Sequence, residues 1–237
     1  TADNNTAFGY NSLGENTTGA NNVAVGAYAL DAVTTATDNT AVGYQALTAN
    51  TANGCTAVGR AALATNTTGQ NTAVGDYALQ ANTTGSVNTA VGKQALQANT
   101  TGGSNSAFGQ SALAANTTGD YNTAMGRNTL DENTTGQYNT AFGMQALSGN
   151  TTADANTAVG MSCLHVNTTG TANTAVGAYA LDANTTASHN TAIGHNSLTA
   201  NIDTSSNTAL GSNTLTVNTG GSYNTALGAG SLSGNTT

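Results

Sequence analysis

One short word, of the form Asn-Thr-Ala-Val-Gly, recurs along the whole chain and constrains its fold more than any other feature. Its glycine returns fourteen times, every 17 residues except for two intervals of 16. An alanine always lies two residues before the glycine, a large apolar residue one before it, and a leucine four after it, as Ala41, Val42 and Leu47 do around Gly43. A repeat this short cannot hold a helical hairpin, since such repeats exceed about 30 residues.

Each repeat carries two segments with strand character. The first word is rich in β-formers and ends at a glycine that permits a bend. The second, at Ala46-Leu47-Thr48-Ala49-Asn50, alternates with a period of two, which predicts a strand with Leu47 and Ala49 on one face. Stacked coils about 4.8 Å apart would cover one another's apolar residues. The sequence therefore predicts an all-β parallel β-solenoid, or β-roll, of about fourteen 16–17-residue coils with two short strands per coil, as one repetitive domain over residues 1–237.

Two asparagine columns follow from this stacking. One precedes the Thr-Ala-Val-Gly word, as Asn39 does, and is broken only by Cys55. The other contains Asn50 and is broken only by Val33. Stacked amides hydrogen-bond from layer to layer in cross-β assemblies. We therefore expect structural ladders at the positions of Gly43, Ala41, Val42, Leu47, Asn39 and Asn50.

The strand word is apolar on both faces, with Val42 on one side and Ala41 on the other. Outward valines would form an apolar ladder that soluble monomers rarely expose, and an outward, invariant alanine would indicate close approach of another surface. Both cases favour lateral self-association along this strand into a homo-oligomer; the alternative is that alanine merely suits a flat, thin solenoid. The chain also begins and ends within a repeat, without a polar cap, so we expect a segment of a longer fibre or a subunit that stacks end to end.

Composition argues against several partners. Only 6% of the residues are charged, the formal net charge is -8, and three residues are basic. Nucleic acid and anionic membrane surfaces are therefore poor partners. No apolar run approaches the roughly 20 residues of a spanning helix, so no membrane insertion is expected.

The residues that could carry chemistry are scattered. Cys55 and Cys163 fall six coils apart, too far for a disulfide. Stacking places His165 beside Asp182, but no zinc-type ligand pattern accompanies them. The Gly-Gly-x-Gly-x-Asp calcium pattern of other β-rolls is absent. We expect no catalytic site, no metal, no cofactor and no enzymatic activity.

Two surface features leave a role in sugar chemistry open. Asn-Thr-Thr is a formal N-glycosylation sequon, yet Asn50 keeps the asparagine without the sequon, which favours a structural role for the column. Tyrosines near the turns could contact sugars or merely pack there. The sequons considered are at Asn16, Asn66, Asn82, Asn99 and Asn116, and the tyrosines are Tyr10, Tyr28, Tyr44, Tyr77, Tyr121, Tyr138, Tyr179 and Tyr223.

Words such as Asn39-Thr40-Ala41-Val42-Gly43-Tyr44-Gln45-Ala46-Leu47 and Asn82-Thr83-Thr84-Gly85 resemble the repeats of bacterial and phage tail-fibre-domain proteins. They are also similar to a longer-period version of the β-roll in the heads of trimeric autotransporter adhesins. The resemblance covers the whole chain. It implies a left-handed, homotrimeric shaft used in attachment, located extracellularly on a cell surface or on a virion, with surface glycans of a host cell as potential partners.

Three functions remain in competition. The first is a structural fibre or adhesin segment that supports attachment, and the second is an extracellular filament built by end-to-end stacking. The third is an ice-binding solenoid, suggested by a threonine column, although a valine stands two residues on where paired Thr-x-Thr columns would need a second threonine. The column contains Thr40, Thr56, Thr72 and Thr89.

Overall fold

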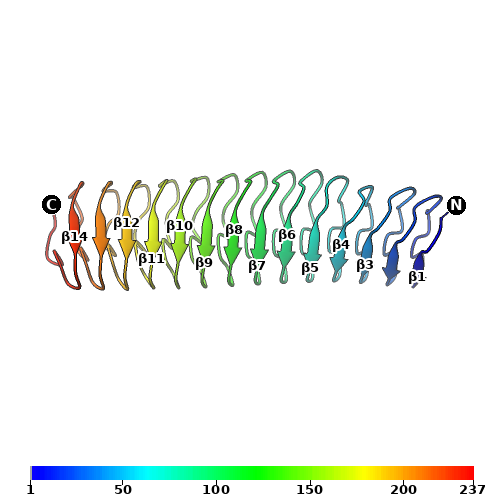
Figure 1. The fold of residues 1–237 in the computed structure, drawn as a ribbon, viewed down its shortest axis with the longest axis horizontal. Helices are drawn as coiled ribbons and strands as arrows, with labels where there is room; N and C mark the ends of the chain where they lie inside the picture. The colour runs from blue at the N-terminus through cyan, green and yellow to red at the C-terminus, as the bar shows by residue number, and fades with distance from the viewer. Residues whose placement is uncertain (1) are drawn as a thin grey trace. The chain divides into compact units, whose positions relative to one another are not determined.

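The computed structural model describes residues 2–237 and contains one strand for each copy of the repeated word, with no helix in that range (Figure 1). The fourteen strands are parallel and follow one another in chain order, which makes the fold a β-solenoid. The chain divides into two compact units, one ending at Asp120 and one beginning at Tyr121. The first unit holds β1 (Thr6–Phe8), β2 (Val23–Val25), β3 (Thr40–Val42), β4 (Thr56–Val58), β5 (Thr72–Val74), β6 (Thr89–Val91) and β7 (Ser106–Phe108). The second holds β8 (Thr123–Met125), β9 (Thr140–Phe142), β10 (Thr157–Val159), β11 (Thr174–Val176), β12 (Thr191–Ile193), β13 (Thr208–Leu210) and β14 (Thr225–Leu227).

Strand pairing within each unit keeps equivalent residues of the repeat opposite one another. Thr40 pairs with Thr56, Ala41 with Ala57, and so on through each unit. Because strand neighbours in a sheet lie about 4.8 Å apart, this register stacks identical side chains at that interval. The predicted parallel solenoid with side-chain ladders is confirmed.

The two 16-residue repeats are one residue shorter than the others in the turn that follows the buried asparagine. The strand register is therefore unaffected. The amide of Asn50 donates to the carbonyl of Ala52, two residues on, at 2.7 Å. The equivalent Asn82, in a 17-residue repeat, donates to the third residue on, Gly85, at 3.0 Å. One less residue in an exposed turn costs little because loops tolerate length changes better than packed elements do.

Alanine lines the interior and the large apolar strand residue points outward. From β2 to β14 the central alanine of each strand is buried, as Ala41 is with no exposed surface. The alanine is therefore constant because it faces the inside of a thin coil, where another coil's alanine lies directly above and below it. The interior is filled further by Ala46 and by leucines that are fully buried, namely Leu30, Leu47, Leu63, Leu79, Leu96, Leu113, Leu130, Leu147, Leu164, Leu181, Leu198 and Leu215.

The second word of the repeat forms a turn in place of the second strand that alternation predicted. Ala46 and Leu47 are both buried while Ala49 is exposed, so Leu47 and Ala49 do not share a face. Leu47 has a φ of 52° and Gln45 a φ of 57°, both in the left-handed region that excludes an extended strand. The expectation of Leu47 and Ala49 on one strand face was wrong.

Backbone hydrogen bonds compensate for this costly conformation. A left-handed non-glycine residue costs on the order of 1 kcal/mol or more. The Leu47 amide donates to the Ala62 carbonyl of the next coil at 3.0 Å, and the Gln45 amide donates to the Ala27 carbonyl of the previous coil at 3.0 Å. The turn thus bonds to both neighbouring coils without being a strand.

The strand glycine is required by both conformation and space. Gly43 has a φ of 136°, a region open essentially to glycine alone. A Cβ on Gly43 would lie 2.5 Å from the carbonyl oxygen of Gly59 in the next coil. The bend predicted at this glycine is confirmed, and close stacking adds a second reason for its constancy.

Candidate interaction surface

The Asn50 column forms an amide ladder inside the solenoid, as predicted. In the first unit, the Asn99 amide donates to the Asn82 side-chain oxygen at 2.8 Å and to the Gly102 carbonyl at 2.9 Å. In the second unit, the Asn184 amide donates to the Asn167 oxygen at 2.8 Å in the same way. Each asparagine therefore links two coils and closes the turn that follows it. Such buried polar groups stabilise a fold only when their hydrogen bonds are made.

The Asn39 column also joins coils, but it does so mainly through the backbone. The Asn88 amide donates to the Gly102 carbonyl at 2.8 Å, and the Asn88 side-chain oxygen accepts a hydrogen bond from the backbone amide of Asn105 at 2.9 Å. Both contacts reach the next coil. Cys55 takes the asparagine position in one coil, and its thiol donates to the Gly69 carbonyl at 3.2 Å, which preserves one of the two links.

The sequons coincide with the interior ladder. The side chains of Asn66, Asn82, Asn99 and Asn116 have no exposed surface. Asn16, in the first coil, is partly exposed, and its amide donates to the Gly19 carbonyl at 3.0 Å. The amide nitrogens that would carry a glycan are thus engaged within the folded chain, and the folded solenoid does not offer these five asparagines as acceptors.

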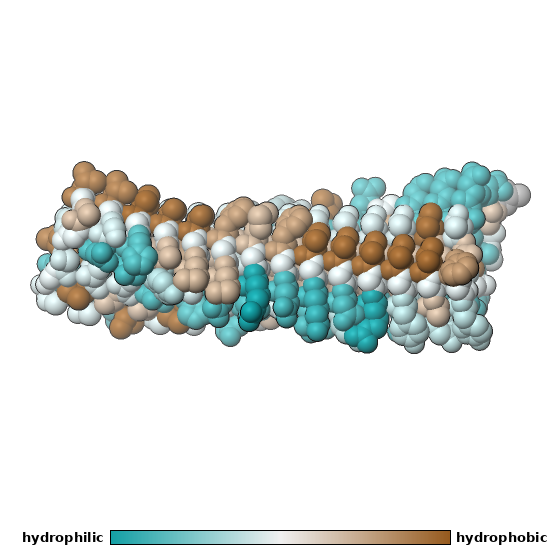
Figure 2. Space-filling model, turned by 90° about the horizontal axis from the view of Figure 1, so that it is seen from below, coloured by the Kyte–Doolittle hydropathy of each residue, from teal (hydrophilic) through white to brown (hydrophobic). Residues whose placement is uncertain are grey.

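In each unit, one face carries a row of apolar side chains, one from every strand. Figure 2 shows part of this row in brown, with teal, hydrophilic residues along one side of it. Val58 is 37% exposed and Val74 is 36% exposed, although each is flanked by an apolar neighbour on both sides. We call this row the outward ladder. In the first unit it consists of Phe8, Val25, Val42, Val58, Val74, Val91 and Phe108, and in the second of Met125, Phe142, Val159, Val176, Ile193, Leu210 and Leu227.

A second column runs beside the outward ladder on the same face. Residues two positions apart in a strand share a face, so Thr40 lies on the same side as Val42 with the buried Ala41 between them. A hydroxyl residue occupies this position in every strand except β2, which has Val23. No charged residue occurs in either column. The face is therefore regular and uncharged.

An ion pair and an aromatic ring lie just after the strand glycines, at the border of this face. The Arg60 guanidinium forms two hydrogen bonds with Asp76, at 2.9 and 3.1 Å, and lies 4.5 Å from the ring centre of Tyr77. The hydrogen bond from Arg60 lowers the pKa of the Asp76 carboxyl group. Because these groups are exposed, the ion pair adds little stability. Its effect is to place a cation and an aromatic ring along the edge of the outward ladder.

Five of the tyrosines, Tyr10, Tyr28, Tyr44, Tyr121 and Tyr138, pack against one another in the turns. The rings of Tyr10 and Tyr28 meet edge to face at 5.4 Å between centroids, and those of Tyr121 and Tyr138 stack at 5.1 Å. Tyr10 is 73% exposed, so its packing leaves most of the ring free. Turn packing accounts for these positions, and sugar binding stays a prediction.

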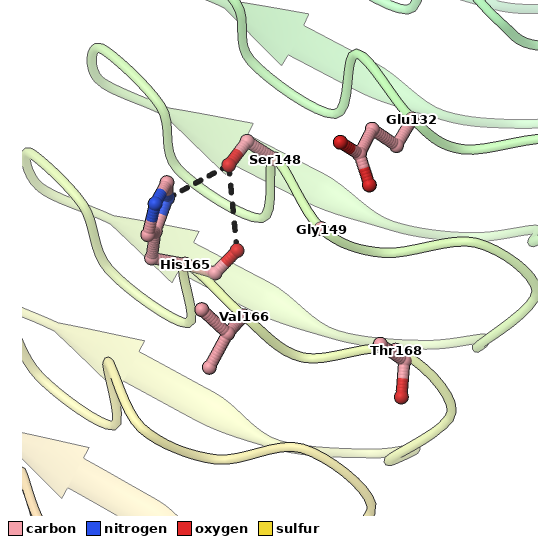
Figure 3. Close-up of a pocket in the computed structure, with 6 residues that line it drawn as sticks. All are labelled: Glu132, Ser148, Gly149, His165, Val166 and Thr168. Carbon is pink, nitrogen blue, oxygen red and sulfur yellow. Dashed lines mark hydrogen bonds between the residues drawn. The ribbon is translucent and has the colours of Figure 1, made fainter.

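The second unit also has a shallow pocket of about 250 Å³. Its lining residues are Glu132, Ser148, Gly149, His165, Val166 and Thr168. In Figure 3, Ser148 and His165 point toward each other across one wall while Glu132 lies apart from them, and the Ser148 oxygen is 2.7 Å from His165 Nδ1.

The direction of the hydrogen bond between Ser148 and His165 depends on the histidine tautomer. The Ser148 hydroxyl also lies 3.3 Å from the His165 carbonyl, and His165 Nδ1 also lies 3.4 Å from the Gln145 carbonyl. Nδ1 donates to these oxygens when it carries the proton and accepts from the Ser148 hydroxyl when it does not. The predicted neighbour of His165, Asp182, interacts with it electrostatically, but burial still raises the pKa of that carboxyl group.

Both cysteines are buried in the interior. Burial raises the pKa of the Cys163 thiol to about 12 and also raises the pKa of Cys55. A thiol of this kind is mostly protonated near neutral pH and is a poor nucleophile or metal ligand. Among residues 2–237, no three His, Cys, Asp or Glu side chains converge on a common metal position. No helix of the described chain is long and apolar enough to cross a bilayer.

Comparison of the chain with protein-family models, with curated proteins and with solved structures gives no match.

Proposed function

We propose that this chain is a structural segment of an extracellular fibre, on a cell surface or a virion, in which copies of the chain cover one another's outward face. The outward ladder carries this proposal. Seven apolar side chains per unit stand in direct succession, without one polar or charged interruption. Monomeric soluble proteins rarely expose contiguous apolar patches above a few hundred Å².

The size of this face fits a stable interface. Strands of three residues are about 10 Å long, and seven of them about 4.8 Å apart cover roughly 340 Å². Each unit therefore offers roughly 340 Å² to a partner, and two unit faces in contact remove roughly 670 Å² from water. Summed over both units of two chains, the area removed is roughly 1,300 Å², and stable interfaces bury about 1,200–2,000 Å² in total. The area is sufficient for lateral association when both units of each chain are covered.

A fibre role agrees with the other features of the chain. Links between coils come from backbone bonds and buried amide ladders, so stability is distributed evenly along the stack, as in other solenoids. The trimer and the left-handed winding implied by the resemblance belong to the same proposal, as does the attachment to host glycans. End-to-end stacking into a filament is the alternative mode of self-association.

Charge placed on the outward face tests the proposal. Val58→Lys/Val74→Lys adds two charges to the face at positions that are already over a third exposed, so a single folded chain tolerates them. We expect association to weaken by orders of magnitude in light scattering after gel filtration, because each buried lysine would lack a partner. The control is Val217→Lys, since Val217 is 40% exposed but lies outside the strands. Equal masses for the double variant and the control would refute the role of this face.

The threonine column supports one second candidate, an ice-binding face. Hydroxyl and methyl groups stand side by side at a constant interval on an uncharged surface. This geometry could order water into a lattice when the face is free. The test measures thermal hysteresis or inhibition of ice recrystallisation. An activity that is lost in Thr72→Lys and kept in Val217→Lys would support ice binding. No effect on ice growth would end this candidate.

A further inference from the structure

The few basic residues of this chain occupy one position of the repeat. All three of its lysines and arginines, namely Arg60, Lys93 and Arg127, come directly after the strand glycine. They are exposed and border the outward ladder where the strands end. This border is called the cation edge; Asp76 is its one acidic member.

Carboxylates gather on the opposite border, where the strands begin. Four aspartates stand two or three residues before the first strand residue, namely Asp3, Asp38, Asp120 and Asp154. The Asp120 carboxylate accepts a hydrogen bond from the backbone amide of Gly103 at 2.6 Å, which holds its charge at that border. This border is called the carboxylate edge. The uncharged outward face thus lies between two edges of opposite charge.

Two copies can meet face to face in two ways. In the first, the second copy is rotated by a half-turn about the stacking direction. Its coils then run in the same direction as those of the first copy, and its strands run in the opposite direction. Each cation edge then lies against a carboxylate edge. In the second, the second copy is rotated by a half-turn about the strand direction. The coils of the two copies then run in opposite directions, and each edge meets an edge of the same charge. Rotation of further copies about an axis along the stack also brings unlike edges together.

We infer that copies of this chain associate with their coils running in the same direction, cation edge against carboxylate edge. This inference rests on the proposed lateral association through the outward ladder. The apolar face supplies most of the free energy and, because it repeats every coil, tolerates either orientation. Unlike edges select one orientation, since electrostatic complementarity mainly confers specificity.

Charge reversal of each edge tests the inference. One variant reverses the cation edge, Arg60→Glu/Lys93→Glu, and another reverses the carboxylate edge, Asp3→Lys/Asp38→Lys. With coils in the same direction, each variant alone associates roughly tenfold or more weakly than the unmodified chain, because like edges then meet. An equimolar mixture recovers the affinity, since unlike edges meet again. With opposed coils, either variant alone associates no more weakly than the unmodified chain, and that result would overturn the inference.

Energy transfer between dyes gives the orientation directly. Tyr10→Cys places a thiol beside β1 at a position that is 73% exposed, while the native Cys55 and Cys163 are buried. Mixed donor- and acceptor-labelled chains should show strong transfer when β1 lies near β1. Association without transfer would refute the shared direction and leave lateral association intact. Absence of any association would refute the proposed function itself.

Discussion

The strand glycines provide a sharp test of how closely the coils stack. In Gly92→Ala, the new Cβ would lie 2.4 Å from the carbonyl oxygen of Gly109 and 2.5 Å from its carbonyl carbon, at a φ of 139°. Strain at such a φ costs about 1–3 kcal/mol, and overpacking against backbone costs about 1–3 kcal/mol more. We therefore expect a loss of about 2–6 kcal/mol in the free energy of unfolding. The contacting atoms are backbone, so no side chain can move aside.

Two other glycines separate strain from collision. Gly54 has a φ of 68°, and the nearest atoms to its Cβ position belong to the Gln70 side chain at 3.5 Å or more, so Gly54→Ala should cost about 1 kcal/mol. Gly234 has nothing within 4 Å, so Gly234→Ala should change stability by less than about 0.5 kcal/mol. Guanidinium chloride unfolding followed by circular dichroism ranks the three variants. If Gly92→Ala cost no more than Gly54→Ala, the close stacking of the coils would be refuted.

Three further predictions use single side chains. Val87 has a φ of 59° and is 65% exposed, so Val87→Asn should stabilise the chain by about 1 kcal/mol. The control Val217→Asn should not stabilise it. Equal unfolding midpoints of the two variants in guanidinium chloride would contradict this prediction. Burial raises the folded-state pKa of Asp131 above 3.8, so its protonated form favours folding and this contribution is lost as pH rises through that pKa. Asp131→Asn should therefore raise stability at pH 7 but not at pH 3, and an unchanged melting temperature at both pH values would refute it. Cys163 should resist iodoacetamide at pH 8 until the chain is unfolded, because its pKa is about 12; rapid modification of the native chain, measured by mass spectrometry, would contradict its burial.

The sequence predicted the stacking, the strand word and the asparagine ladders because each leaves a periodic signal. The second strand was mispredicted because Leu47 and Ala49 alternate like a strand, while the φ angles that decide the conformation leave only a weak trace. That trace is the constancy of leucine at this position: valine and isoleucine never replace it, and β-branched side chains are the least tolerant of positive φ.

The direction in which Ala41 and Val42 point could not be predicted from the pattern. Both are apolar and alternation assigns them to opposite faces without saying which face is inside. The structure decides this, because Ala41 is fully buried and Val42 is partly exposed. The two charged edges were likewise hidden, because Arg60 and Asp38 become parts of opposite borders only when the coils are stacked.

The central claim is that the outward ladder is covered by other copies of this chain, and native mass tests it most directly. Sedimentation equilibrium of the unmodified chain over a wide concentration range should give a mass of more than one chain; three chains would agree with the trimer that the resemblance implies. Growth without limit as concentration rises would favour end-to-end filaments. A single-chain mass at every concentration would contradict the account, because it would show that the apolar ladder remains open to water.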